Sequence, residues 1–300
     1  VVRFSQRPEL VGVRFGGSSE TGARLYSAAA AEGIRVRVLG ESKDHALVMA
    51  DCALERTAAG IINAFCGCAG RRCMALPVVV AEEPVADALV RLLREKAAHL
   101  KLGPAYDKNT TLGPLVSASR RKNVLDWIGR GIREGAELVL DGRGISVPGY
   151  ENGFFIGPTL FDHVTPGMSI GEQEICGPVL CIKRVRNFEE GLSVMIANPF
   201  ANGSVIYTQN GRYAREFTRR THGGMVGVNV GIPVPVCSFG FTGHKRSFFG
   251  DLHTMGTDGV RFYTEKKTVT STWLEDGHSG IVDTWDGTLG SLSENSGKRN

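Results

Sequence analysis

The chain has 300 residues, of which 42% are hydrophobic, 22% are charged and 8% are aromatic. These values are typical of a folded globular protein with a large core, and they exclude a mainly disordered chain. The formal net charge is +4 and no block of five like charges occurs, so a nucleic-acid surface is not indicated. No apolar run approaches the roughly 18 residues of a membrane span.

Alternating apolar residues over 11–15 predict a strand, and the glycine turn at 16–19 leads into a helix that ends near Glu32. A serine of the turn is the expected helix cap. Residues 34–39 alternate again and predict a second strand. Because a helix connects these two strands, we expect them to pair in parallel.

Strands and helices alternate through most of the remaining chain, which indicates the α/β class. Residues 232–249 are rich in Pro, Gly and Phe and predict an ordered, functional loop. Residues 260–273 predict one long strand, and the composition of 275–300 predicts a disordered tail. The other expected strands are 46–49, 77–81, 137–140, 154–156, 159–161, 179–185, 204–208 and 225–230, and the other expected helices are 51–63, 84–100, 117–134, 187–197 and 212–221.

The spacing of the cysteines and histidines indicates neither a disulfide framework nor a metal site. Seven cysteines occur without a Cys-x-x-Cys pair, so we expect reduced thiols and an intracellular protein rather than a disulfide framework. The histidines show no metal-ligand spacing, and we expect no metal site. The chain begins with Val1 and shows no signal or transit pattern, so we expect it to be part of a longer protein.

Cys73 is the strongest candidate for a catalytic nucleophile in the sequence. It follows a glycine-rich loop and the pair Arg71-Arg72, and it precedes a buried strand. Adjacent positive charge lowers the pKa of a thiol and raises its reactive fraction. We therefore predict that Cys73 is a nucleophile. The alternative is a buried packing cysteine, which is what we expect of Cys66 and Cys68.

Two other segments carry groups suited to a cofactor. In Phe-Gly-Gly-Ser-Ser at 15–19, a strand, a turn and a helix start leave backbone N–H groups for a phosphate. A plain strand–helix turn is the alternative, since a complete Gly-x-Gly-x-x-Gly is missing. Glu172 and Glu174 precede a buried strand, where a glutamate suits hydrogen bonds to ribose hydroxyls. The alternative is a solvated acidic loop.

Together these segments resemble the aldehyde dehydrogenase superfamily. The resemblance rests on Ala-Gly-Arg-Arg-Cys-Met-Ala at 69–75, Glu-Ile-Cys-Gly-Pro at 174–178 and the 15–19 segment. It runs from about Val1 to Trp273. Within the superfamily, the segments at 149–154, 197–203, 227–235, 238–243, 259–263 and 267–273 are similar to the methylmalonate-semialdehyde dehydrogenases, which acylate coenzyme A.

The resemblance implies a domain organisation. Residues 1–45 correspond to the end of a Rossmann-like NAD-binding domain, 46–255 to an α/β catalytic domain and 256–274 to an oligomerisation strand, with the tail at 275–300. It implies a homo-oligomer that has neither a nucleic-acid nor a membrane partner. It places the protein in the mitochondrial matrix of a eukaryote or the cytoplasm of a bacterium. Because only one strand–helix–strand unit of the NAD domain is present, we expect residues 1–300 to bind NAD poorly.

The resemblance also implies a reaction and residue roles. The Cys73 thiolate attacks methylmalonate or malonate semialdehyde, hydride passes to NAD, and coenzyme A takes the acyl group with loss of CO2, as in valine and pyrimidine catabolism. Arg72 corresponds to the arginine that binds the substrate carboxylate. Glu174 corresponds to the glutamate that binds the nicotinamide ribose, and Gly17 and Ser18 correspond to the turn near the pyrophosphate.

The hydrolytic branch of the family carries a glutamate base where this chain has Val38 or Leu39, and Glu41 is displaced from that position. The absence of a base that activates water favours a thiol acceptor. Two alternatives stay open. One is a hydrolytic enzyme that uses Glu41 or Glu174 as its base, and the other is a non-catalytic remnant that persists as a folded or partner-bound module.

Overall fold

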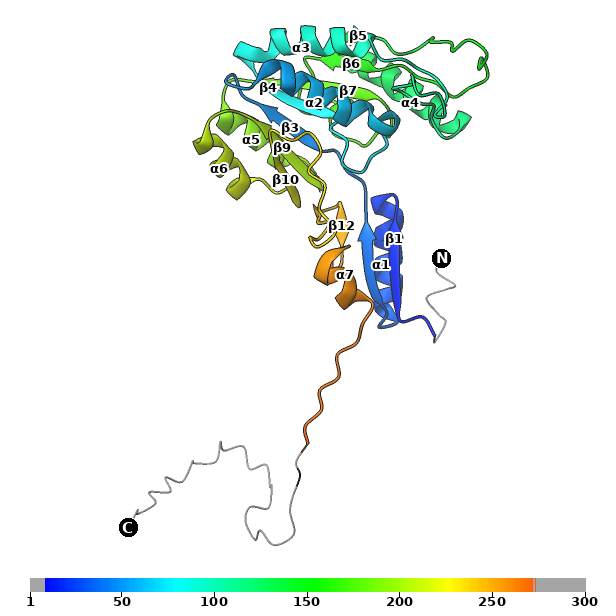
Figure 1. The fold of residues 1–300 in the computed structure, drawn as a ribbon, viewed down its shortest axis with the longest axis vertical. Helices are drawn as coiled ribbons and strands as arrows, with labels where there is room; N and C mark the ends of the chain where they lie inside the picture. The colour runs from blue at the N-terminus through cyan, green and yellow to red at the C-terminus, as the bar shows by residue number, and fades with distance from the viewer. Residues whose placement is uncertain (1–8, 272, 274–300) are drawn as a thin grey trace. The chain divides into compact units, whose positions relative to one another are not determined.

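The computed structural model describes residues 9–271 and Trp273 (Figure 1). Residues 1–8 and the predicted tail at 275–300 lie outside the described residues. The chain divides into two units, Val1–Thr264 and Glu265–Asn300. Every helix and strand named below belongs to the first unit, and the described residues of the second unit form none.

The first unit opens with the predicted strand–helix–strand. Strands β1 (Gly12–Gly16) and β2 (Arg35–Leu39) are parallel, with α1 (Ser19–Ala31) between them in sequence. The Ser18 hydroxyl accepts the N–H of Thr21 at 3.4 Å and caps α1. The short strand β12 (Phe248–Phe249) pairs antiparallel with the other edge of β2, so the sheet order is β1-β2-β12. This last strand lies within the predicted loop 232–249 and extends the sheet of the N-terminal segment.

A seven-stranded sheet forms the larger core, and the parallel pairing of most of its strands confirms the α/β class. All neighbouring pairs are parallel except β5 and β6. Most of its strand residues are buried, as expected of parallel strands covered by helices. The order is β10 (Met225–Val228), β9 (Gly203–Tyr207), β3 (His45–Val48), β4 (Val78–Glu82), β7 (Val179–Val185), β6 (Thr159–Asp162) and β5 (Glu137–Leu140).

Helices cover both faces of this sheet (Figure 1). Helices α2 (Leu54–Cys66) and α3 (Glu83–Ala98) lie on one face, and α5 (Phe188–Ala197) and α6 (Gly211–Arg220) lie on the other. Helix α4 (Ala118–Arg133) packs on the short helix η2 (Ser169–Gly171). The apolar residues that recur at helical spacing in α3, such as Leu89 and Leu93, are fully buried. This is expected of a helix that packs one apolar face against a core.

Two predicted strands are wrong. Residues 154–156 form no strand, because their backbone bonds to loops: the Phe154 carbonyl accepts the N–H of Leu115 at 2.9 Å. The predicted strand at 260–273 begins instead inside helix α7 (Gly256–Phe262), and 263–271 pair with no strand among the described residues. A strand without a neighbour leaves its backbone groups unpaired, whereas the carbonyls at the end of α7 find donors on β2. Arg35 donates to the carbonyls of Phe262 at 2.6 Å and Thr264 at 3.1 Å.

Candidate active site

The candidate site lies where four neighbouring parallel strands begin. Strands β9, β3, β4 and β7 are consecutive in the sheet. Asn202 precedes β9, the segment 41–44 precedes β3, Cys73 lies before β4, and Glu174 lies before β7. Because parallel strands start at the same edge of a sheet, residues far apart in sequence meet there. The convergence of Cys73 and Glu174 therefore follows from the topology.

The loop that carries Cys73 has an unusual backbone. It follows α2 through the short helix η1 (Gly67–Gly70), in which Cys68, Ala69 and Gly70 have φ values of 52°, 54° and 71°. Non-glycine residues adopt this left-handed conformation only at a cost. The backbone of Gly177 and Pro178 lies so close to Gly70 that no side chain would fit there. The loop before β4 is thus packed directly against the loop that follows Glu174.

The main-chain carbonyl of Cys73 is held from two sides. The side-chain amide of Asn202 donates to it at 2.7 Å, and the hydroxyl of Ser42 donates to it at 2.9 Å. Asn202 and Ser42 are both buried, whereas Cys73 itself is exposed. The contacts fix the peptide on the C-terminal side of Cys73 and leave the thiol accessible to a substrate.

The predicted lowering of the Cys73 pKa by the two arginines is wrong. Arg72 donates to the carbonyl of Asn63 on α2 at 3.3 Å, and Arg71 donates to the carbonyl of Cys68 at 3.1 Å. The pKa of Cys73 is raised, first by burial and then by the carboxyl groups of Asp44 and Glu174. The two arginines next to Cys73 in sequence therefore do not set the pKa of its thiol, because backbone carbonyls bind both guanidinium groups.

Glu174 is connected to the same segment as Cys73. Its carboxylate accepts the N–H of Ser42 at 3.2 Å and the Ser42 hydroxyl at 3.4 Å. Burial raises the pKa of Glu174, and the negative charge of Glu41 adds to this effect, while the Ser42 N–H opposes it. One serine thus contacts both the peptide of Cys73 and the carboxylate of Glu174.

The turn that contains Gly17 and Ser18 meets the residue next to Ser42. The Glu41 carboxylate accepts the N–H of Ser19 at 3.1 Å, and the Glu41 N–H donates to the Ser19 hydroxyl at 2.9 Å. The segment Glu41-Ser42 therefore joins the helix start at 18–19 to Glu174 and Cys73. The structure brings together all the predicted site segments, although Arg72 reaches back towards α2.

Comparison with known proteins gives the family. The sequence profile of the aldehyde dehydrogenase family matches residues 2–269. The chain belongs to this family.

The relatives of the chain include a malonate-semialdehyde dehydrogenase of Oceanobacillus iheyensis, which is 43% identical over 274 residues, or 91% of this chain and 56% of the relative. A structure described as a methylmalonate-semialdehyde dehydrogenase of Sinorhizobium meliloti, complexed with NAD, is 43% identical with a TM-score of 0.88, covering 90% of this chain and 55% of that one. The structure of the methylmalonate-semialdehyde dehydrogenase of Oceanimonas doudoroffii is 41% identical with a TM-score of 0.89, and the match covers 91% of this chain and 56% of that one. The chain thus spans about half the length of the relatives it matches.

Two parts of the candidate site are suited to a dinucleotide. Helix α1 offers an N-terminus of the kind that binds phosphate, and Glu174 offers a carboxylate suited to hydroxyl groups. The N–H of Gly17, however, is already bonded to the Leu39 carbonyl at 3.0 Å, and the N–H of Ser19 is bonded to Glu41. The residues fit such a ligand in type and place, with one departure: a resident carboxylate at the helix start.

Three residues of the site were missed from the sequence. Ser42 lies in a polar stretch without any motif, and Asn202 lies in a segment noted only for its resemblance to the family. Asp44 is buried, its Oδ1 accepts the N–H of Gly203 at 2.8 Å, and its Oδ2 has no hydrogen-bond partner. Burial holds the pKa of Asp44 well above its ordinary value. For all three residues, the sequence feature that could have identified them is a polar side chain just before a buried parallel strand.

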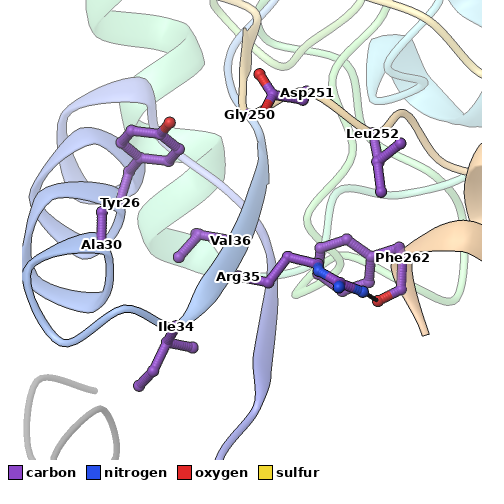
Figure 2. Close-up of a pocket in the computed structure, with 9 residues that line it drawn as sticks. All are labelled: Tyr26, Ala30, Ile34, Arg35, Val36, Gly250, Asp251, Leu252 and Phe262. Carbon is purple, nitrogen blue, oxygen red and sulfur yellow. Dashed lines mark hydrogen bonds between the residues drawn. The ribbon is translucent and has the colours of Figure 1, made fainter. Parts of the chain in front are cut away.

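The other prominent features lie outside this site. A cavity of about 250 Å³ between α1, β2 and residues 250–252 is lined by none of the predicted site residues (Figure 2). Within the described residues, no three His, Cys, Asp or Glu side chains gather as a metal site. No helix among residues 9–271 is long and apolar enough to cross a membrane.

Proposed function

We propose that this chain carries the acyl-transfer site of an NAD-dependent, coenzyme A-acylating dehydrogenase of malonate or methylmalonate semialdehyde. The observation that carries the proposal is the pair of contacts made by Ser42, which binds the Cys73 carbonyl at 2.9 Å and the Glu174 carboxylate at 3.2 Å. This arrangement places an accessible thiol beside a carboxylate at the start of the sheet. The similarity to malonate-semialdehyde dehydrogenases supports the substrate class.

In the proposed reaction, the Cys73 thiol loses its proton and its sulfur attacks the aldehyde carbon, which forms a C–S bond and a thiohemiacetal. Gly17, Ser18 and Glu174 would hold NAD, which would supply the acceptor for the hydride of this carbon. The thiohemiacetal oxygen loses its proton in the same step, and a thioester remains on Cys73. The thiolate of coenzyme A then attacks the thioester carbonyl and displaces the Cys73 sulfur. The carboxylate of the substrate leaves as CO2, and the electron pair of the broken C–C bond takes up a proton at the α-carbon, so that the product is propionyl-CoA or acetyl-CoA.

Asn202 and Ser42 have a positioning role in this proposal. By holding the Cys73 carbonyl they fix the peptide whose N–H belongs to Met74. The N–H groups of Cys73 and Met74 both favour a negative charge on the sulfur of Cys73. Fixed backbone donors of this kind stabilise developing charge without reorganisation. Their contribution opposes the burial that disfavours the thiolate.

Arg72 is proposed to bind the substrate carboxylate. Its guanidinium makes a single hydrogen bond, to the Asn63 carbonyl, and is partly exposed. A guanidinium has five N–H donors, so most of them stay available for a carboxylate. On this proposal, Arg72→Leu weakens the reaction of malonate semialdehyde far more than that of propionaldehyde, because only the former carries the negative charge.

The hydrolytic reaction is the second candidate, and the raised pKa of Glu174 favours it, since a base poised nearer neutrality activates water more effectively. Glu41 does not fit that role, because its carboxylate is bonded to Ser19 at the helix start. The two candidates differ in the fate of the thioester on Cys73.

The test uses propionyl-CoA and the purified chain at pH 8, and it measures free coenzyme A and propionate. The proposed acyl transfer predicts release of about one equivalent of coenzyme A per chain, with the acyl group retained until coenzyme A is added in excess. Continuous release of propionate would support the hydrolytic reaction. Absence of both products would contradict each of them. The variant Cys73→Ala is the matched control.

A further inference from the structure

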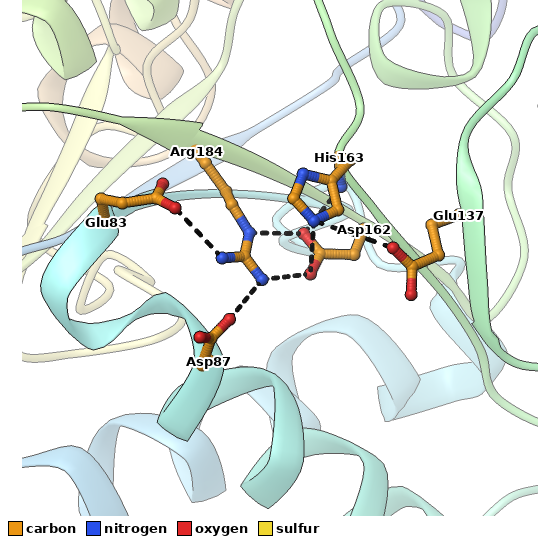
Figure 3. A network of polar contacts seen from close by, with 6 residues as sticks. All are labelled: Glu83, Asp87, Glu137, Asp162, His163 and Arg184. Carbon is orange, nitrogen blue, oxygen red and sulfur yellow. Dashed lines mark hydrogen bonds and ion pairs between the residues drawn. The ribbon is translucent and has the colours of Figure 1, made fainter.

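Lys183 is a largely buried residue whose amine has no partner. It lies in the middle of β7, its residue is only 5% exposed, and among the described residues it takes part in no hydrogen bond and no ion pair within 4.0 Å. A buried ammonium is expensive unless it is paired. The next residue of β7, Arg184, shows how a largely buried cation is usually paired with carboxylates. Arg184 binds Asp162 and Asp87 at 2.7 Å each and Glu83 at 3.3 Å (Figure 3).

Because successive side chains of a strand point to opposite faces, Lys183 and Arg184 lie in different environments. Arg184 points towards α3, where it meets the carboxylates of Glu83 and Asp87. Lys183 lines a cavity of about 290 Å³ beside α5, on the other face of the sheet. No residue of this cavity belongs to the candidate active site.

The cavity is mainly apolar, and its walls include Pro166, Val194, Ala197 and Pro199. Asn198 also lines the cavity, but its amide nitrogen is closed off from solvent and its Oδ1 accepts the N–H of Phe200 at 2.9 Å. The side chain of Asn198 therefore offers no free group to a ligand in the cavity.

The charged groups around Lys183 come from several elements. Lys43, before β3, is fully buried and donates to the Ile170 carbonyl at 2.8 Å, and Cys181 lies two residues earlier on β7. His45 is buried on β3, and its pKa is lowered to about 3, so it is neutral at pH 7. Glu172 is the acid that lines the cavity, and its carboxylate accepts the N–H of Gly167 at 2.9 Å. Burial lowers the pKa of Lys183, while Glu172 and Cys181 oppose the shift.

We propose that the Lys183 cavity is a second reactive site, in which the lysine amine captures short-chain aldehydes as imines. A desolvated lysine in a mainly apolar pocket is a residue that proteins use for Schiff-base chemistry. The apolar walls take the alkyl chain of the aldehyde. The proposal stands on the cavity and its unpaired amine and does not depend on the proposed function of Cys73.

The step balances without an oxidant or reductant. The Lys183 nitrogen attacks the aldehyde carbon, a C–N bond forms, and the carbonyl oxygen becomes the hydroxyl of a carbinolamine. Glu172 is the group that we assign to accept a proton from nitrogen and to return it to the hydroxyl. The C–O bond then breaks, water leaves, and a C=N bond remains.

Reductive trapping on the whole chain tests the proposal. Propionaldehyde and sodium cyanoborohydride are added at pH 7, and the alkylation of each lysine is quantified by peptide mass spectrometry. Because a lowered pKa leaves more of the Lys183 amine neutral and the cavity holds the aldehyde beside it, we expect Lys183 to be alkylated several-fold faster than the exposed Lys122. Lys43, which is buried and lines none of the cavities described here, should stay unmodified. Alkylation of Lys183 at the rate of Lys122 or below would overturn the proposal.

Two variants separate the cavity from the reactivity of the amine alone. Ala197→Phe fills the cavity from the exposed face of α5 and should abolish trapping at Lys183 while circular dichroism stays unchanged. Ser119→Phe, on the exposed surface of α4, is the matched control and should leave trapping intact. Unchanged trapping at Lys183 in Ala197→Phe would show that the cavity has no part in it.

Discussion

Asn202 donates its side-chain amide to the main-chain carbonyl of Cys73 at 2.7 Å, across 129 residues of sequence. Together with Ser42, it holds the peptide that follows the proposed nucleophile. Asn202 precedes β9 and Ser42 precedes β3, so two strands of the sheet fix the position of a loop that belongs to a third. The reactive loop therefore depends on the sheet as a whole for its geometry.

The two donors to the Cys73 carbonyl should be energetically coupled. Asn202→Ala and Ser42→Ala should each lower the free energy of unfolding by about 1–2 kcal/mol, because each leaves a buried carbonyl with one bond fewer. The double variant should lose more than the sum, since the carbonyl then has no side-chain donor. Urea unfolding of the four proteins measures the coupling. Strict additivity would show that the two contacts act independently.

Alkylation of Cys73 should have a pH midpoint above that of a free thiol. Burial and the nearby carboxyl groups disfavour the thiolate, so the folded protein keeps the proton to higher pH. Arg72→Leu should leave this midpoint unchanged, because its guanidinium is bonded to Asn63. Glu174→Gln should lower the midpoint, since it removes a negative charge. Iodoacetamide rates between pH 6 and pH 10, resolved by peptide, measure it, and a clear rise in Arg72→Leu would contradict the account.

The sequence predicted regular elements well where local signals agree with tertiary packing. Ser18, Ser117 and Asn187 cap helices as such residues usually do. The helix expected at 51–63 begins only at Leu54, so Asp51 does not cap it. The Asp51 carboxylate instead accepts the hydroxyl of Thr208 at 2.8 Å. A short polar side chain has several partners within reach, and the one it binds is decided by a strand distant in sequence.

Only some residues of the candidate site could be predicted from the sequence, and its electrostatics could not. Cys73 and Glu174 could be singled out because motifs mark them. The orientation of Arg71 and Arg72 could not, because it depends on backbone carbonyls that only the folded loop presents. The bridging role of Glu41 and Ser42 depends on strand order, which alternation of apolar residues does not give. The β-branched and aromatic residues at 260–273 predicted a strand, yet a helix forms at 256–262, where Arg35 and Arg37 of β2 meet its end.

Glu41 should weaken the binding of a dinucleotide. Its carboxylate occupies the Ser19 N–H at the start of α1, the place where a phosphate would gain from the helix dipole. A charge at a helix end contributes about 0.3–1 kcal/mol, so Glu41→Gln should raise NAD affinity about two- to fivefold from a weak starting value. Calorimetric titration measures it. The control is Glu20→Gln, in the same turn but paired with Arg24. Equal gains in both variants would point to net charge alone.

Arg184 should matter for stability more than any exposed ion pair. Its guanidinium is 14% exposed and binds the 4% exposed Asp162 through two nitrogens. Arg184→Met should lower the free energy of unfolding by roughly 3 kcal/mol, because it leaves a buried carboxylate unpaired. The control Arg186→Met removes an 84% exposed partner of Glu190 and should cost less than about 1 kcal/mol. Similar urea midpoints for both variants would contradict the assigned role of Asp162.

The central claim is that Cys73 carries the acyl group, and peptide mapping after reaction with propionyl-CoA tests it most directly. At pH 8 the propionyl group should appear on Cys73, disappear in Cys73→Ala, and stay unchanged in Cys68→Ala, a neighbouring cysteine that is also exposed. It should also be removed when coenzyme A is added in excess, because the thioester exchange is reversible. Acylation of Cys68 or Cys237 to the same extent as Cys73, or its persistence in Cys73→Ala, would contradict the account.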